Sequence, residues 1–400
     1  MSKLMNNMLP DLIVGKLRSV LPGLPPSSIH ALHEPEFKGF ERDYVLDCIE
    51  TGWVSSVGGY VDRIERELEQ ITGAARAVAV SSGTSALQVG LNLAGVKVDD
   101  EVLVPTLTFV GSANAICHIG ATPHFIDSDP KRLAVDPEKL RRYLERIAGR
   151  ENSKTINRKT GRPISALIVV HIFGHPADMA ELQLVADEFE ITIVEDAAES
   201  LGSTIGERHT GTFGKVAALS FNGNKIVTTG GGGAILSMDI DIGDRAKHLT
   251  TTARVSAGWE FDHDEIGWNL RMPNLNAALG CAQLERLPDA LARKRYLAAQ
   301  YVDTFSDVPN VIIIREPEGC RSNFWLNSIM VKDRETRNAV LEACNTAGFM
   351  ARPCWRLMHT LPMFNFCPRD DLSMSEHLVD RLINLPSSPQ LMGWDGIVEK

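Results

Sequence analysis

A single lysine, Lys225, stands between a short apolar run and four consecutive glycines. The run from Ala217 to Phe221 is typical of a strand, and the glycines from Gly230 to Gly233 allow the chain to turn. Burying an ammonium near such a strand is costly unless the amine is paired, neutralised or used chemically. The lysine therefore has three interpretations: it binds phosphate beside a glycine-rich loop, holds a carbonyl compound as a Schiff base, or lies on the surface before a turn.

The sequence lacks the nucleotide-binding motifs that would support the first interpretation. A Walker-type loop needs Gly-Lys followed by Ser or Thr, whereas Lys225 follows Asn224 and precedes Ile226. The dinucleotide motif G-x-G-x-x-G also fails from Gly230, because Ile235 occupies the position of its last glycine. Nucleotide hydrolysis and a Rossmann dehydrogenase therefore lose their main support.

A second polar segment, from Ser81 to Ala86, follows the apolar run Arg76 to Val80 and opens a helical pattern. Free N–H groups at a helix N-terminus bind phosphate well, and hydroxyl side chains there reinforce them. The same Ser and Thr residues are also ordinary helix caps, so this segment alone leaves both interpretations open.

An acidic residue, Asp196, follows another predicted strand, Ile191 to Glu195. Its carboxylate could cap a helix, bind a metal or face a cationic ring nitrogen. A metal is disfavoured because no H-E-x-x-H occurs and because His171 and His175 span a predicted strand-to-turn junction. We therefore expect no metal site, and structural or substrate-facing roles for these two histidines.

The three features together match the needs of pyridoxal phosphate. That cofactor requires an anchor for its phosphate, a carboxylate that keeps its pyridine nitrogen protonated, and a lysine that holds its aldehyde. The segment from Ser81, the acid Asp196 and Lys225 occur in that order along the chain. Each motif is modest by itself, and their ordered combination predicts a pyridoxal-phosphate site.

The elements that must position these residues alternate between short β-branched runs and helical patterns. Such alternation with short connections predicts an α/β fold whose mainly parallel sheet is covered by helices on both faces. Ligands bind at the carboxyl ends of the strands in such sheets. The predicted strands are 76–80, 101–104, 123–126, 166–170, 191–195, 217–221 and 234–237, and the predicted helices between them include 85–94, 137–148 and 179–189.

Beyond residue 274 the pattern changes to a long helix over 275–305, strands over 311–314 and 324–331, and a helix over 334–347. This change predicts a smaller α+β domain at the C-terminal end. Residues 10–21 predict a short amphipathic helix that packs on the protein itself or on a second subunit. The polar segment Arg146 to Pro163 predicts a solvated loop or hairpin.

Composition is typical of a soluble cytoplasmic protein. The 41 basic and 51 acidic residues give a formal charge of -10, which offers no electrostatic support for nucleic-acid binding. The 7 cysteines are scattered and contain no C-x-x-C pair, as expected of reduced thiols. No apolar run reaches the roughly 18 residues that span a bilayer. We therefore expect a cytoplasmic protein with neither nucleic acid nor membrane as a partner.

Taken together, the motifs resemble those of the DegT/DnrJ/EryC1/StrS sugar aminotransferases, pyridoxal-phosphate enzymes of fold type I. The resemblance implies an N-terminal extension over residues 1–35, a large cofactor-binding domain over 36–273 with a seven-stranded sheet, and a small α+β domain over 274–400. The matching motifs are S-G-T-S-A at 82–86, P-T-x-T-F at 105–109, H-x-F-G at 171–174, E-D-A-A at 195–198, S-x-x-x-x-K at 220–225 and G-x-N-x-R-M at 267–272.

The resemblance assigns the catalytic roles to Lys225, as the Schiff-base lysine, and to Asp196, as the partner of the pyridine nitrogen. It implies that Phe109 stacks on the cofactor ring. Glu199, where many members carry Gln or His, is expected to bond the phenolic oxygen of the cofactor. A carboxylate repels a phenolate unless a proton is shared between them or the side chain turns away, which leaves the role of Glu199 open.

The resemblance also implies a phosphate site and a substrate pocket in a homodimer whose active sites are shared between subunits. Asn269 is expected to reach the phosphate of the cofactor in the second subunit. Within one subunit, the residues expected around the phosphate are Gly83, Thr84, Ser85 and Ser220. Those expected around the substrate are Trp53, Ser55, His171, Arg271 and His359.

The implied reaction transfers an amino group from an amino acid, L-glutamate by family habit, to C4 of a nucleotide-linked 4-keto-6-deoxy-2-acetamido sugar for bacterial surface glycans. The runs T-G-W-V-S-S-V-G and N-G-N-K-I-V-T-T-G-G-G-G resemble the legionaminic-acid and bacillosamine-type branch, which favours UDP over GDP in the acceptor. A perosamine-type enzyme that uses a GDP-sugar is the nearest alternative. A sugar dehydratase of the same fold and a non-catalytic protein are both disfavoured by Lys225, since the dehydratase branch carries histidine there.

Overall fold

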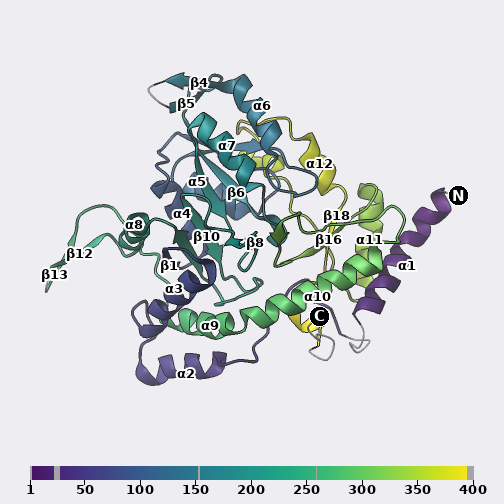
Figure 1. Ribbon diagram of the computed structural model, residues 1–400, viewed down its shortest axis with the longest axis horizontal. Helices are drawn as coiled ribbons and strands as arrows, with labels where there is room; N and C mark the ends of the chain where they lie inside the picture. The colour runs from purple at the N-terminus through teal and green to yellow at the C-terminus, as the bar shows by residue number, and fades with distance from the viewer. Residues whose placement is uncertain (1, 22–27, 152–153, 258, 394–400) are drawn as a thin grey trace.

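A seven-stranded sheet lies at the centre of the structure, a computed structural model that describes residues 2–21, 28–151, 154–257 and 259–393 (Figure 1). Along the sheet the strands are β1 (Arg76–Val80), β11 (Gly233–Ser237), β10 (Val216–Ser220), β7 (Thr192–Asp196), β6 (Ile164–Val170), β2 (Glu101–Pro105) and β3 (Thr122–Ile126). β11 runs antiparallel to both neighbours, and the other pairs are parallel. The predicted α/β fold with a mainly parallel seven-stranded sheet is confirmed.

Both faces of the sheet are buried because successive strand residues point to opposite sides and each side is covered by helices. Val194 and Ala218 point to the face covered by α4 (Gly83–Leu93), α5 (Val110–His118) and α8 (Ile240–Thr250). Ile193 and Leu219 point to the face covered by α3 (Gly59–Thr72), α6 (Pro137–Ile147) and α7 (Met179–Phe189). Burial on both sides explains why the strands read as almost continuous apolar runs.

All the strands except β11 run in one direction, so their carboxyl ends meet at the same edge of the sheet. β7 ends at Asp196 and β10 ends at Ser220. Ser82 follows β1 and caps α4. The alternation of strands and helices therefore brings the three predicted features to one place.

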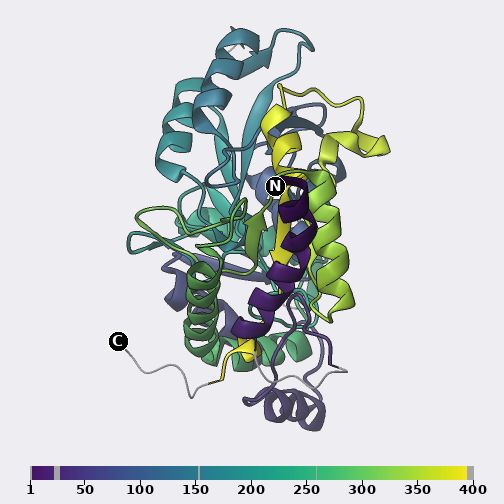
Figure 2. The ribbon, with the colours of Figure 1, turned by 90° about the vertical axis from the view of Figure 1, so that its right-hand side faces the viewer.

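A second, smaller sheet is antiparallel and has the order β14 (Ile312–Ile313), β16 (Asn327–Met330), β18 (Leu382–Leu385) and β17 (Arg352–Pro353). Its core is shared with α10 (Leu287–Phe305), α11 (Arg334–Thr346) and α1 (Ser2–Val20). Figure 2 shows α1 lying alongside α11. The expected N-terminal extension thus packs on this smaller unit, with a helix that begins earlier than the predicted residue 10.

The helix predicted over residues 275–305 is wrong in one respect, because the chain forms two helices, α9 (Asn274–Glu285) and α10, separated at Arg286. Pro288 explains the break, since proline removes a backbone donor and clashes with the carbonyl four residues earlier. α9 packs on α2 (Glu41–Thr51) and α3, within the core of the large sheet. The division of the chain at residues 36 and 274 stays a prediction.

Several short elements complete the described chain. The polar segment forms a hairpin of β4 (Ala148–Glu151) and β5 (Lys154–Asn157), and a second hairpin of β12 (Arg254–Ala257) and β13 (Glu260–His263) projects from the body (Figure 1). The β12–β13 hairpin carries two exposed aromatic residues, Phe261 and Trp259, and Trp259 is 98% exposed. No helix in the described ranges is long and apolar enough to cross a membrane. The remaining elements are β8 (Thr204–Ile205), β9 (Arg208–His209), β15 (Cys320–Arg321), α12 (Ser373–Val379) and four 3-10 helices, Ile172–Gly174, Met358–Thr360, Pro362–Phe364 and Pro389–Leu391.

Candidate active site

A cavity of about 320 Å³ opens at the carboxyl edge of the large sheet. The ends of β1, β7 and β10 form much of its wall, and two tryptophans, Trp325 and Trp355, complete it from the C-terminal part of the chain. The predicted cofactor residues that line it are Gly83, Thr84, Phe109, Asp196, Glu199, Ser220 and Lys225. Residues far apart in the sequence therefore meet in one cavity.

The N-terminus of α4 forms one end of this cavity. Ser82 caps the helix, because its Oγ accepts a hydrogen bond from the Ser85 N–H at 3.1 Å. Helix geometry leaves the first N–H groups, those of Gly83 and Thr84, without partners inside the helix. With the Ser220 side chain in the same wall, this end presents N–H groups and hydroxyls suited to a phosphate.

Close packing requires glycine at two positions beside this helix N-terminus. A Cβ at Gly83 would lie 2.8 Å from the Cβ of Ser220, and a Cβ at Gly233 would lie 2.6 Å from the Gly83 nitrogen. Real Cβ atoms do not approach other atoms so closely, so side chains at these positions would push α4 away from β10 and β11. The glycines thus let Ser220 lie against the helix N-terminus.

Asp196 lines the same cavity and is buried. Its Oδ2 accepts a hydrogen bond from the Ser112 hydroxyl at 2.6 Å, and its Oδ1 accepts one from the Ala198 N–H at 3.2 Å. Burial raises the pKa of Asp196, although these hydrogen bonds and the charge of Lys225 act in the opposite direction. A cationic hydrogen-bond donor in the cavity would stabilise the ionised carboxylate.

Lys225 enters the cavity from the connection between β10 and β11. Its Nζ lies 3.3 Å from Glu199 Oε1 and 3.7 Å from the centre of the Trp325 ring. The Lys225 N–H donates to the Asn222 carbonyl at 2.9 Å, which closes a tight turn just before the lysine. The amine is therefore held between a carboxylate and an aromatic face, close to the end of β7.

Glu199 is buried, and its two carboxylate oxygens have different partners. Oε1 pairs with Lys225, while Oε2 accepts a hydrogen bond from the Phe173 N–H at 2.8 Å. Phe173 adopts a φ of 56°, a left-handed conformation that is rare for an aromatic residue. Burial raises the pKa of Glu199, and the charge of Lys225 opposes that rise. The carboxyl group can therefore share a proton with a neighbouring oxygen.

Phe109 precedes α5, lines the cavity and is 52% exposed as a residue. The ring meets Trp355 edge-on, with 6.2 Å between centroids. A Cβ at Gly111 would lie 3.0 Å from the Phe109 ring, so glycine leaves room for it there. An aromatic side chain with one open face in the cavity wall can stack on a planar ring.

His171 is completely buried and lies behind the cavity rather than in its wall. Its Nδ1 accepts a hydrogen bond from the Ala177 N–H at 3.1 Å, which leaves Nε2 to donate to Glu195 Oε2 at 2.9 Å. The Glu195 carboxylate also accepts hydrogen bonds from the N–H groups of residues 211, 213 and 214. Both residues thus have structural partners, and contact of His171 with substrate stays a prediction.

Three other predicted substrate residues lie away from the cavity wall in the described chain. Trp53 is 57% exposed and lines a separate pocket of about 300 Å³. The Ser55 carbonyl accepts a hydrogen bond from the Asn274 N–H at 2.6 Å. His359 is buried, and its Nδ1 lies 2.8 Å from Thr106 Oγ1. Their roles toward substrate are not tested by these contacts.

Asn269 and Arg271 lie next to the end of β1. The Ser81 N–H donates to the Leu270 carbonyl at 2.8 Å, which places this segment near the N-terminus of α4. Arg271 donates to Asn269 Oδ1 through Nε and Nη2, at 3.1 and 3.0 Å. Asn269 is exposed. Its expected contact with the cofactor of a second subunit stays a prediction.

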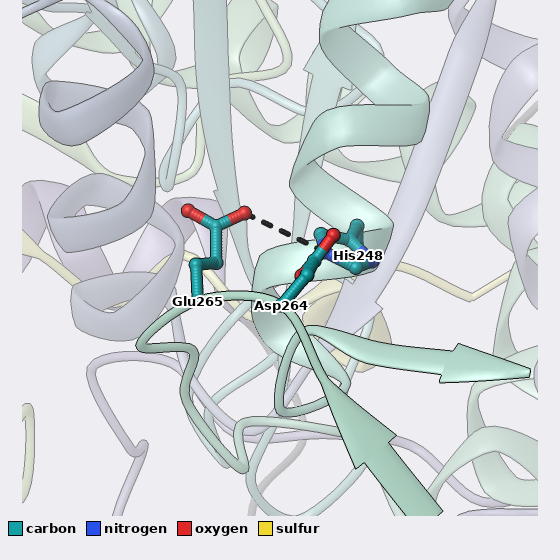
Figure 3. A group of neighbouring side chains, drawn as sticks. All are labelled: His248, Asp264 and Glu265. Carbon is teal, nitrogen blue, oxygen red and sulfur yellow. Dashed lines mark hydrogen bonds and ion pairs between the residues drawn. The ribbon is translucent and has the colours of Figure 1, made fainter.

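A possible metal-binding group lies outside the cavity, at the base of the β12–β13 hairpin (Figure 3). His248 Nε2 lies 2.8 Å from Asp264 Oδ1 and 3.5 Å from Glu265 Oε1. Glu265 also forms an ion pair with Arg245, which already supplies a positive charge to the acidic pair. We assign this exposed group as an ion-pair network that anchors the hairpin to α8.

Sequence reasoning missed several residues of the cavity wall. Ser112 lies three residues after Phe109, so helical spacing in α5 is a signal that could have placed it beside Phe109 in the cavity wall. Trp325 and Trp355 offer no such signal, because they follow Lys225 by 100 residues or more and belong to the smaller unit. Only the packing of the two units brings them to the lysine.

The cavity fits pyridoxal phosphate on observations of this chain alone. The glycine-lined end beside α4 suits a phosphate, and the open face of Phe109 suits a planar ring. Asp196 is a buried carboxylate, and among the described residues no basic side chain lies within ion-pair distance of it. A protonated ring nitrogen would supply the missing positive partner. Lys225 supplies the amine that can hold the cofactor aldehyde.

Comparison with known proteins agrees with this fit. A sequence model of the DegT/DnrJ/EryC1/StrS aminotransferase family matches residues 35–397. The chain is 36% identical to the GDP-perosamine synthase of Vibrio cholerae, over 90% of this chain and 94% of that one, and 33% identical to that of Escherichia coli O157:H7, over 90% and 93%. The solved structure of the aminotransferase TlmJ from Streptoalloteichus hindustanus superposes with a TM-score of 0.82 at 26% identity, over 92% of this chain and 96% of that one.

Proposed function

Because the chain belongs to the DegT/DnrJ/EryC1/StrS aminotransferase family, whose members depend on pyridoxal phosphate, we propose that it transfers the amino group of L-glutamate to C4 of a nucleotide-linked 4-keto-6-deoxy hexose. The observation that carries the proposal is the meeting of Lys225, Asp196 and the α4 N-terminus in one cavity. The product would be an amino sugar for a bacterial surface glycan.

Each residue of the site has a part in this reaction. Pyridoxal phosphate supplies an aldehyde that condenses with amines and a ring that withdraws electrons from the bond being broken. Gly83, Thr84 and Ser220 would bind its phosphate, and the Asp196 carboxylate would keep a proton on its ring nitrogen. Lys225 would hold the aldehyde carbon through Nζ, and its free amine would move a proton at the substrate carbon.

The nucleotide of the acceptor is the finer part of the proposal. The relatives named GDP-perosamine synthase favour a GDP-linked acceptor, whereas the sequence runs around Trp53 and Lys225 favour a UDP-linked 2-acetamido sugar. We prefer the GDP-linked sugar because the similarity to the two synthases, at 36% and 33% identity, covers 90% of this chain. The UDP-linked sugar is the second candidate.

A homodimer with shared active sites is part of the proposal. Exposed apolar side chains on α2 and on either side of it, among them Phe40, Ile49 and Val57, offer a surface that a second copy would cover. The projecting hairpin adds Trp259 and Phe261. Asn269 lies at the base of that hairpin and would face the phosphate of the second cofactor. Sedimentation velocity tests this state, and a monomer at micromolar concentration that remains fully active contradicts it.

The test of the function combines spectroscopy with an acceptor panel. Purified protein with pyridoxal phosphate should absorb as a lysine imine, and glutamate should convert it to the amine form. GDP- and UDP-linked 4-keto-6-deoxy sugars are then offered with glutamate, and the product is identified by NMR. Lys225→Ala should show neither the imine absorbance nor the conversion by glutamate. Lys215→Ala, outside the cavity, should behave as wild type. Failure of the spectral conversion, or transfer to none of the sugars, overturns the proposal.

A further inference from the structure

Trp325 makes the closest aromatic contact to the lysine amine. The Lys225 Nζ lies over the indole ring, 3.7 Å from its centre, while Glu199 Oε1 lies 3.3 Å from the same atom. A cation over an aromatic face is attracted by the negative charge density of the ring, and the attraction is larger where water is excluded. The amine therefore has two partners in contact, one a carboxylate and the other an aromatic ring.

Hydrogen bonds of both the side chain and the backbone hold Trp325 in place. Its Nε1–H donates a hydrogen bond of 2.8 Å to the carbonyl of Asn224, the residue directly before the lysine, and its backbone N–H donates one of 2.8 Å to Asn323 Oδ1. The Trp325 carbonyl accepts a hydrogen bond from the buried Lys294 Nζ at 3.1 Å. The indole is thus bonded to the turn that carries Lys225, and the Trp325 backbone is bonded to α10.

These contacts become relevant when Lys225 is not bonded to the cofactor. A lysine that holds an aldehyde at rest must leave it when an amino acid takes its place, and it then needs to stay within reach. We propose that Trp325 is a positioning residue for Lys225, whose released amine it holds over its indole face against Glu199. The proposal rests on the imine-forming role proposed for Lys225.

The ring face and the indole N–H can be separated by two substitutions. Trp325→Phe and Trp325→Leu both remove the hydrogen bond to Asn224, but only Trp325→Phe keeps an aromatic face under the amine. Their difference therefore reports the ring alone. Trp355→Leu is the matched control, because Trp355 lines the same cavity and packs on Phe109 and Phe173.

The measurement is the rate at which each apoprotein forms its lysine imine with added pyridoxal phosphate, followed by absorbance between pH 6 and pH 10. Imine formation requires the uncharged amine, so losing a partner of the charged amine lowers the pH of half-maximal rate. The expected midpoint of Trp325→Leu lies about half a pH unit or more below that of Trp325→Phe, the size of a partly desolvated cation–π contact. Trp355→Leu should keep the wild-type midpoint.

The outcomes distinguish this proposal from the function itself. Equal midpoints in Trp325→Phe and Trp325→Leu, or an equal shift in Trp355→Leu, overturn the positioning role of Trp325 and leave the aminotransferase proposal standing. Absence of imine formation in the wild-type protein refutes the role of Lys225 instead. Far-UV circular dichroism of each apoprotein checks that the fold is kept, and Trp325→Met, which also removes the ring, replaces Trp325→Leu in the comparison with Trp325→Phe if Trp325→Leu does not fold.

Discussion

His175 is a buried histidine whose two ring nitrogens have no hydrogen-bond partner among the described residues. Its ring meets Phe324 edge-on, with 5.4 Å between centroids. Burial lowers the pKa of His175 from 6.5 to about 4, although the charge of Glu316 acts in the opposite direction. The folded protein therefore keeps this imidazole neutral at pH values where the unfolded chain already protonates it. We predict that His175→Phe removes a large part of the acid sensitivity of the fold.

The sign and the size follow from proton linkage. Between pH 6.5 and about 4 the unfolded chain binds a proton at His175 and the folded protein does not, so the free energy of unfolding falls as the pH falls. The difference between the two pKa values of His175 corresponds to about 3 kcal/mol in the free energy of unfolding. About 2 kcal/mol of it is lost between pH 7 and pH 5. At pH 7 the substitution should cost little, because phenylalanine has a similar shape and removes two unpartnered polar atoms.

Urea unfolding at pH 7 and at pH 5 measures the effect. Wild type should lose about 2 kcal/mol more on acidification than His175→Phe does. His377→Gln is the control, since His377 is exposed on α12 and its substitution should leave the acid loss unchanged. The same acid loss in wild type and in His175→Phe would refute the reasoning, because the buried ring would then titrate as in the unfolded chain.

Three further predictions concern the cavity. Gly83→Ala should weaken pyridoxal-phosphate binding by about 1–3 kcal/mol in a titration, because its Cβ would lie 2.8 Å from Ser220 Cβ; Gly59→Ala, which meets nothing within 4 Å, should not. Asp196→Asn should lower kcat by about two to four orders of magnitude through loss of a buried charge partner, and a loss below tenfold contradicts that role. Glu199→Gln should keep activity within about tenfold of wild type in steady-state assays, since the amide still accepts from the Phe173 N–H; a loss beyond a hundredfold would mean that the charge is required.

The sheet and the end of the cavity beside α4 can be predicted from the sequence because each depends on local pattern. Apolar runs separated by helical patterns predict the seven strands. Asp196 lies at the end of β7 as expected, and β10 ends at Ser220, one residue before the predicted end. Gly83 and Lys225 line the cavity for the same reason. Parallel strands bring their carboxyl ends together wherever the intervening helices pack, so order along the chain was sufficient.

The parts that were not predicted depend on long-range packing or on a single residue. Pro288 divides a pattern that otherwise reads as one helix, and its effect was overlooked. Trp325 reaches Lys225 only because the smaller unit packs on the larger one. The ion pair between Glu199 and Lys225 likewise follows from a turn after β7 that local spacing does not specify.

Glu195 and Asp196 are neighbours on β7, and the first has structural partners while the second lines the cavity. Glu195 points away from the cavity and is saturated by His171 and by three backbone N–H groups, whereas Asp196 points into it with one side left for a ligand. The period of a strand separates them, so neither interferes with the other. Substitutions at Glu195 should therefore lower the yield of folded protein, whereas substitutions at Asp196 should give protein that is well folded but inactive. A variant library sorted first by abundance and then by turnover would place these adjacent positions in different classes.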